Sequence, residues 1–197
     1  MVELVLDPEL LKPQKVVPRR RPLSRRAYDA LVARGVFDDE RIELLRGQLV
    51  TMSPQGGLHA AVSARIAQRL IGLLDGSYDV RSHSPYAASD DSEPEPDISV
   101  SRRARRLRYH PSKALLLIEV SESSLRKDRL VKAEIYAENR APEYWIVDLA
   151  SRSVFVHTEP ARGTYRSIVR LRRKDVLRPV YVPGIELTVA ELFRAPR

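Results

Sequence analysis

The stretch EPDISV (residues 95–100) decides the fold, together with the apolar run ALLLIEVS (residues 114–121) that follows it. Both have the composition of short strands, and each carries one carboxylate. If they pair as an antiparallel hairpin, the start of the first strand lies beside the end of the second. Side chains alternate between the two faces, so the right register puts Asp97 and Glu119 on one face. A charge inside an apolar strand is costly unless it is paired or bound to a metal, so Glu119 marks a candidate site.

Two carboxylates on one face predict a site for a divalent cation. Their oxygens suit a hard cation such as Mg²⁺, and Mn²⁺ is a possible substitute. In metal-assisted hydrolysis of a phosphodiester, the ion polarises the phosphoryl oxygen and lowers the pKa of its bound water. A nearby lysine can position that water and stabilise negative charge on the phosphorus.

The lysine has to come from outside the strand. Two residues after the glutamate stands Ser121, which carries no charge. On the following helix, Asp128, Lys132 and Tyr136 are spaced i, i+4, i+8 and share one face. Lys127 is expected to point away from that face. From spacing alone, an exposed Asp128–Lys132 pair worth about 0.3–0.5 kcal/mol is the better interpretation.

Composition restricts the class of protein. The chain has 197 residues, a net charge of +8 and no cysteine. Disulfides and thiolate zinc sites are therefore excluded, and an intracellular, cytoplasmic setting is favoured. No apolar run is long enough for a membrane span. The positive charge favours an anionic partner, most commonly nucleic acid, although a basic soluble protein without such a partner fits equally well.

The basic residues form two clusters. Residues 12–26 contain seven Lys or Arg, no acid and three prolines, so we expect residues 1–23 to be a basic, proline-containing extension and residues 24–197 to be a single domain. The second cluster, in the loop of the expected hairpin, includes Arg102, Arg103, Arg105 and Arg106. Either cluster could neutralise phosphates, and a solvated surface is the alternative for each.

Helical and strand patterns alternate along the chain. Periodicity and caps predict helices at about 25–33, 59–74, 123–140 and 188–193, and strands at 41–45, 48–52, 78–84, 97–100, 114–121, 143–148, 153–157 and 164–169. Several strands are hairpin partners, whereas others are separated by helices. This order predicts an α/β or α+β fold, with a central mixed sheet flanked by helices.

Seven motifs in a fixed order resemble a known family. They are ELLRG (43–47), MSP (52–54) followed by His59, EPD (95–97), EVS (119–121), the helix residues Asp128, Lys132 and Tyr136, PEYWIVD (142–148), and Pro183-Gly184. Their order and spacing, over about residues 24 to 193, are similar to the Uma-type family of bacterial proteins described as restriction endonucleases. The resemblance implies the PD-(D/E)xK nuclease fold, a restriction-endonuclease-like sheet of four to five strands with helices on both faces. It also implies a magnesium site from Asp97 and Glu119, with Lys132 supplied by the helix.

Further site residues follow from the same resemblance. Glu43 matches the family's early glutamate and could complete the metal shell, or it could be an outward-facing strand residue. His59 could contact phosphate or orient a ligand, although a cap or a packed residue is the more common role. Asp128 and Tyr136 are possible supporting residues. The other histidines, at 83, 110 and 157, show no metal-ligand spacing.

Two functions remain open from the sequence. The first is a magnesium-dependent endonuclease that hydrolyses phosphodiester bonds in DNA, and the second is a non-cleaving module of nuclease fold that binds nucleic acid or protein. The presence of Asp97, Glu119 and Lys132 together favours the enzyme. We expect Lys132 to point into the cleft that holds both acids, and one of the two carboxylates to have a raised pKa. A homodimer is possible.

Overall fold

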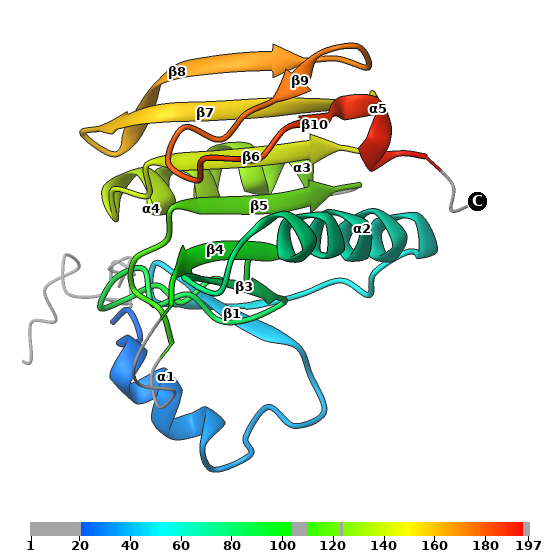
Figure 1. Ribbon diagram of the computed structural model, residues 1–197. Coiled ribbons are helices and arrows are strands. Elements are labelled where there is room, and N and C mark those ends of the chain that lie inside the picture. Colours follow the sequence, from blue (N-terminus) through cyan, green and yellow to red (C-terminus); the bar gives the residue numbers. More distant parts are fainter. Residues whose placement is uncertain (1–20, 104–109, 123, 195–197) are drawn as a thin grey trace, which may run out of the picture.

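A six-stranded mixed sheet forms the centre of the protein (Figure 1). The structure, a computed structural model, describes residues 21–103, 110–122 and 124–194. The strand order is β3-β4-β5-β6-β7-β8, in which β5 and β6 are parallel and every other neighbouring pair is antiparallel. The strands are β3 (Tyr78–Ser82), β4 (Ile98–Arg102), β5 (Leu116–Ser121), β6 (Glu143–Asp148), β7 (Ser153–Ala161) and β8 (Thr164–Leu171). This sheet confirms the predicted mixed fold and has more strands than expected.

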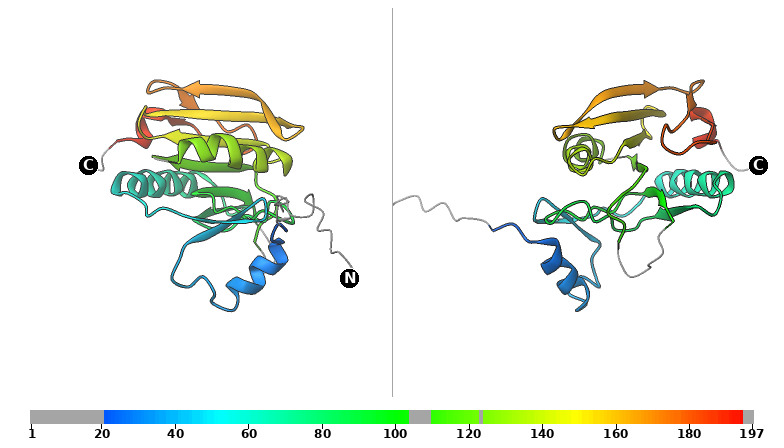
Figure 2. Two further views of the ribbon diagram at one scale, coloured as in Figure 1. Left: turned by 180° about the vertical axis from the view of Figure 1, so that it is seen from behind. Right: turned by 60° about the vertical axis from the view of Figure 1, so that its left-hand side comes forward.

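Helices cover both faces of the sheet (Figure 2). On one face lies α2 (Gly57–Leu73), whose buried residues Val62, Ile66 and Leu70 pack in a common core with β4, β5 and β6. On the other face, α3 (Leu125–Lys127) runs through a π-helical turn (Asp128–Lys132) into α4 (Ala133–Glu138). The buried residues of α4 form a second core with Tyr144 and Ile146. Each helix therefore buries its apolar stripe against one side of the sheet.

The alternation along β5 places the charged side chain of that strand. Ile118 and Val120 belong to the core under α2, whereas Leu117 belongs to the core under α4. Because side chains alternate, Glu119 faces the α3–α4 side. In the β4–β5 ladder Ile98 pairs with Ile118, so one step further the register brings Asp97 opposite Glu119. The expected antiparallel hairpin is therefore present in the expected register.

Shorter elements surround the sheet. The first helix, α1 (Arg25–Val32), is capped at its N-terminus by Ser24, whose hydroxyl accepts a hydrogen bond from the Ala27 amide. The strands β1 (Ile42–Leu45) and β2 (Gln48–Thr51) form a separate two-stranded sheet. Near the C-terminus, β9 (Val176–Leu177) pairs with β10 (Leu187–Thr188), followed by α5 (Val189–Leu192). The two-residue strands β9 and β10 are too short for the sequence pattern to predict.

The helix predicted over residues 123–140 is not one continuous α-helix. It comprises α3, the π turn and α4, and residue 123 lies outside the described part of the chain. Of the predicted N-terminal extension, residues 1–20 also lie outside it. Within the described ranges, no helix combines the length and the apolar character needed to cross a membrane.

Candidate active site

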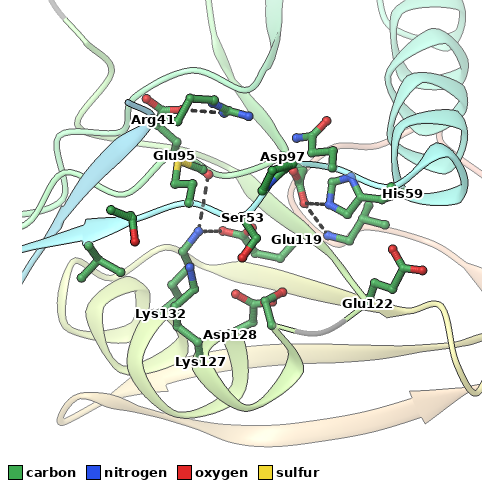
Figure 3. A pocket seen from close by; sticks show the side chains of 18 residues that line it. Arg41, Ser53, His59, Glu95, Asp97, Glu119, Glu122, Lys127, Asp128 and Lys132 are labelled. Atoms are coloured by element: carbon green, nitrogen blue, oxygen red, sulfur yellow. Dashed lines mark hydrogen bonds and ion pairs between the residues drawn. The ribbon is translucent and has the colours of Figure 1, made fainter. Parts of the chain in front are cut away.

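A cavity of about 300 Å³ lies between the β1–β2 hairpin, the start of α2, the β4–β5 ladder and the α3–α4 segment (Figure 3). Five residues that the sequence analysis singled out line it, namely His59, Asp97, Glu119, Asp128 and Lys132. Two more, Glu43 and Tyr136, contact these residues from behind the wall. The fold thus brings together side chains from four elements that are far apart in the sequence.

Lys132 is at the centre of a buried ionic network. Its Nζ donates to Glu119 Oε1 at 2.9 Å, lies 3.0 Å from Glu43 Oε2, and donates to the Glu95 carbonyl at 3.4 Å. Burial alone would lower the pKa of Lys132, but the carboxylates of Glu119 and Glu43 outweigh burial and raise this pKa. The ammonium group therefore stays charged, and it points toward the carboxylates as expected.

The pKa of Glu119 is shifted in the opposite direction to that of Asp97, which lies opposite it across the β4–β5 ladder. Burial raises the pKa of Glu119 well above its usual range, and Lys132 opposes this rise only in part. Tyr136 Oη and Lys132 Nζ both donate to Glu119 Oε1, at 2.8 Å and 2.9 Å. Because the hydrogen bonds go to Oε1, Oε2 is the oxygen available to a cation.

Asp97 is held ionised by two imidazoles and a backbone amide. Its Oδ2 accepts from the Val120 amide at 2.7 Å and lies 3.2 Å from His59 Nε2, while Oδ1 lies 3.2 Å from His83 Nδ1. Burial would raise the pKa of Asp97, but hydrogen bonds from the two histidines hold it well below its usual range. In return, Asp97 outweighs burial and raises the pKa of His59.

His83 is a site residue that the sequence analysis missed. It follows β3, with a positive φ of 46°, and its amide donates to the Asp97 carbonyl at 3.0 Å. The Gln55 amide lies 3.1 Å from His83 Nδ1. The spacing between His59 and His83 matches no metal-ligand motif, and only the antiparallel β3–β4 pairing brings His83 to Asp97. The sequence did offer one signal for this contact, which is the histidine at the end of a strand that could pair with the strand beginning near Asp97.

Glu43 and Asp128 are both buried, whereas the sequence allowed each of them to be an exposed surface residue. Glu43 is fully buried rather than outward-facing. Its carboxylate accepts hydrogen bonds from Lys127 Nζ at 2.7 Å and from the Glu95 amide at 3.3 Å. Burial would raise the pKa of Glu43, but Lys132 and Lys127 lower it. Asp128 and Lys132 do not form an exposed pair, because both are buried. Asp128 Oδ2 instead accepts from the hydroxyls of Ser121 and Ser124, each at 2.6 Å.

The expectation that Lys127 points away from the site is wrong. Its Nζ lies 2.7 Å from Glu43 Oε1, and its side chain lines the same cavity as Lys132. The cause is the π turn at Asp128–Lys132. A π turn closes i→i+5 hydrogen bonds, so residues five positions apart come nearly onto one side, which they would not do in an α-helix. The sequence carries no direct signal for this turn.

The described members of the second basic cluster, Arg102 and Arg103, lie away from the cavity. The Arg102 guanidinium stacks over the Tyr78 ring, 4.5 Å from the ring centroid, and Arg103 Nη1 donates to the Gly76 carbonyl at 3.1 Å. The other two members, Arg105 and Arg106, lie outside the described residues. Neither Arg102 nor Arg103 lines the cavity.

The donor set of the cavity fits one kind of metal site. Within the described ranges, no group of three or more His, Cys, Asp or Glu is arranged to hold a metal ion. Magnesium, however, is typically bound by one or two carboxylates, with waters and substrate phosphates completing its shell. Asp97, which is held ionised, and Glu119, with Oε2 available, line one cavity. Burial favours the protonated form of Glu119, and a cation at Oε2 would favour its carboxylate form. These two residues could then hold magnesium in its two-carboxylate mode.

A further buried carboxylate, Glu93, lies outside this network. Within the described part of the chain, its Oε2 has no hydrogen-bond partner, and the nearest cation, Arg25 Nη1, is 3.7 Å away. Burial, aided by Asp29 and opposed by Arg25, raises the pKa of Glu93 to about 7. The unfolded chain releases this proton near pH 4.5, so the stability contributed by the protonated carboxyl is present at low pH and is lost as the pH rises toward 7.

We expect Glu93→Gln to stabilise the protein more at pH 8 than at pH 5. The amide cannot ionise, so the variant avoids a cost that reaches roughly 3 kcal/mol above pH 7. Urea denaturation of both proteins at the two pH values measures this difference. Equal shifts at pH 5 and pH 8 would show that Glu93 does not titrate in this range.

Two solved structures are similar to this chain. A crystal structure from Anabaena variabilis ATCC 29413, described as "a putative nuclease belonging to DUF820", is similar with a TM-score of 0.63 and 16% identity, covering 79% of this chain and 90% of that chain. At this identity the likeness shows the fold alone. The type IIG restriction endonuclease BpuSI gives a TM-score of 0.41 and 18% identity over 68% of this chain and 15% of its own.

Curated proteins give no match to the sequence. The family model named Uma2, with the description "Putative restriction endonuclease", matches residues 27–190, which is most of the chain and includes every described residue of the cavity. The family inferred from the order of the motifs is thereby confirmed. The chain belongs to the Uma2 family.

Proposed function

We propose that the protein is a magnesium-dependent endonuclease that hydrolyses phosphodiester bonds in DNA, with Mn²⁺ as a possible substitute. One observation carries this proposal. Two carboxylates, Asp97 directly before β4 and Glu119 in the adjacent strand β5, line one cavity together with Lys127 and Lys132. Paired carboxylates can hold a metal ion and fixed ammonium groups can stabilise developing charge, and metal-assisted phosphodiester hydrolysis uses both.

Asp97 and Glu119 would hold the cation. When bound, the ion supplies polarisation of a phosphoryl oxygen and a water of lowered pKa. His59 and His83 fix the orientation of the Asp97 carboxylate, as outer residues commonly do around ligands. Tyr136 and Lys132 fix Glu119 by hydrogen bonds to the same oxygen.

The reaction is a simple hydrolysis. The oxygen of water bonds to phosphorus, one P–O ester bond breaks, and the proton released by the water balances the alkoxide that leaves. An ammonium group at the cavity stabilises the charge that develops on the phosphoryl oxygens. DNA as the substrate is supported by the family description and by the net charge of +8.

The direct test is nicking or linearisation of supercoiled plasmid. We expect cleavage with Mg²⁺ or Mn²⁺ and none with EDTA. The Asp97→Asn protein, purified in parallel, controls for contaminating nuclease. Metal-independent cleavage, or equal activity in the variant, would refute the proposal. DNA binding without any cleavage would instead support the non-cleaving module.

We expect the second basic cluster to contribute to DNA affinity through phosphates. Replacing Arg102, Arg103, Arg105 and Arg106 by alanine should reduce the slope of log affinity against log salt by about 0.9 for each phosphate that these arginines neutralise. Fluorescence anisotropy with a labelled duplex over a series of salt concentrations measures this slope.

A control of equal charge comes from the opposite end of the sheet. Alanine at the exposed residues Arg166, Arg170, Arg172 and Arg173, in and after β8, removes the same charge. We expect it to leave the slope nearly unchanged. If both variants lower the slope equally, only net charge matters, and the cluster beside the hairpin is a solvated surface.

A further inference from the structure

The ammonium group of Lys132 has no N–H left for a substrate. A lysine ammonium has three donors, and three oxygens lie within 3.4 Å of Lys132 Nζ: Glu119 Oε1, Glu43 Oε2 and the Glu95 carbonyl. The residue is only 2% exposed. Turning an N–H toward a phosphate would therefore break a bond to a buried carboxylate, at the high cost of a buried, unpaired charge.

Lys127 differs from Lys132 in both respects. Its side chain is 30% exposed and lines the cavity. In the described part of the chain, Glu43 Oε1 is the acceptor found for its Nζ, which leaves two N–H groups for a ligand. Glu43 thus receives one lysine on each carboxylate oxygen, and it fixes Lys127 on the open side and Lys132 on the closed side.

The charged residues around the cavity also favour Lys127 over Lys132 as the lysine that contacts a substrate. Its wall carries five acids, at residues 95, 97, 119, 122 and 128, and three fixed cations, Arg41, Lys127 and Lys132. Arg41 is paired with Glu95 at 2.9 Å and Lys127 with Glu43 at 2.7 Å, and both are partly exposed, whereas Lys132 is enclosed. Of the two lysines at the cavity, Lys127 is therefore the one whose donors can meet an incoming phosphate beside the carboxylates.

We propose that Lys127 is the catalytic lysine that contacts the phosphate undergoing hydrolysis, and that Lys132 is a positioning residue that holds Glu43 and Glu119. This inference rests on the proposed nuclease function. It assigns contact with the phosphate to one lysine and the positioning of the carboxylates to the other. The position of Lys127 depends on the π turn that follows it.

The first experiment requires no cleavage. The full-length Asp97→Asn protein is labelled with an amine-acetylating reagent, with and without a duplex of about 20 base pairs whose binding is followed in parallel by anisotropy. We expect Lys127 to be acetylated in the free protein and protected several-fold by DNA. Lys132 should remain unlabelled in both samples until the protein is unfolded. The exposed Lys174 serves as the internal reference.

The second experiment compares three variants in the plasmid assay. Lys127→Ala should lower kcat by about 10²- to 10³-fold, as the loss of one transition-state donor typically does, while thermal unfolding stays close to that of the wild type. Lys127→Arg, which keeps the charge, should recover part of the rate. The matched control is Arg126→Ala, an exposed neighbour on α3 that does not line the cavity, and we expect its rate within about twofold of the wild type.

The outcomes separate the two proposals. If the duplex binds but neither protects Lys127 nor loses cleavage in Lys127→Ala, the assignment of Lys127 is overturned and the nuclease function stands. Acetylation of Lys132 in the folded protein, with protection by DNA, would likewise overturn the division of roles. If the protein neither binds nor cleaves DNA, the proposed function falls, and the inference falls with it.

Discussion

Replacing Lys132 by alanine is expected to lower the free energy of unfolding by about 3–5 kcal/mol. The change removes the ammonium group from between Glu43 and Glu119, both of which are buried. Glu43 would keep Lys127, but Glu119 would lose its only ion-pair partner within the described residues. Urea denaturation followed by circular dichroism measures the effect, and an unchanged slope with urea would show that the unfolded state is unaffected.

A double variant identifies the cause of this destabilisation. Adding Glu119→Gln to Lys132→Ala removes the buried acid that has lost its ion-pair partner, so we expect it to restore part of the stability. Lys174→Ala, at an exposed position, is the control and should change stability by less than about 0.5 kcal/mol. A decrease below about 1 kcal/mol for Lys132→Ala would show that the network contributes little. Sequence spacing alone pointed instead to an exposed pair with almost no effect.

Asp97→Asn is expected to lower the rate of plasmid cleavage by about 10³-fold or more. A cation bound as proposed would contribute several kcal/mol of transition-state stabilisation, and each 1.4 kcal/mol corresponds to a factor of about ten. The amide removes the charge that His59 and His83 keep on Asp97. Magnesium should raise the melting temperature of the wild type by mass action, and this increase should be absent in the variant. Both measurements use the same protein preparations.

The matched control for Asp97 is Glu122→Gln. Glu122 also lines the cavity, but it is exposed and forms no part of the ionic network. We expect the variant to keep both most of its rate and the stabilisation by magnesium. If Asp97→Asn keeps the magnesium-induced shift, the cation binds elsewhere. If both variants lose activity equally, total negative charge at the cavity matters more than the pair formed by Asp97 and Glu119.

The sequence predicts the part of the site that depends on strand periodicity. Alternation and hairpin pairing are local rules, and they place Asp97 opposite Glu119 correctly. The spacing of Asp128, Lys132 and Tyr136 predicts a shared helix face, but it does not place that face at Glu119. The resemblance to the Uma-type family implied Lys132 at the site, and in the structure Lys132 and Tyr136 both donate to Glu119.

Other features depend on tertiary structure and have no local signal. The burial of Glu43 follows from the docking of the separate β1–β2 hairpin against the segment between β3 and β4, where Leu44 exchanges backbone hydrogen bonds with Glu93. The contact between His83 and Asp97 requires the β3–β4 pairing. Lys127 was misplaced because the prediction assumed regular α-helical rotation through Asp128–Lys132.

The π turn also affects how relatives of this protein should be aligned. It accommodates one residue more than the corresponding α-helical turn. A relative with a regular α-helix here would therefore align with a one-residue gap, and its residue in the column of Lys127 would be rotated by about 100°. An alignment column without a lysine at this point does not show that the cation is missing, because an adjacent position can supply it. Superposed structures, rather than columns of letters, are the appropriate basis for deciding which members share this lysine.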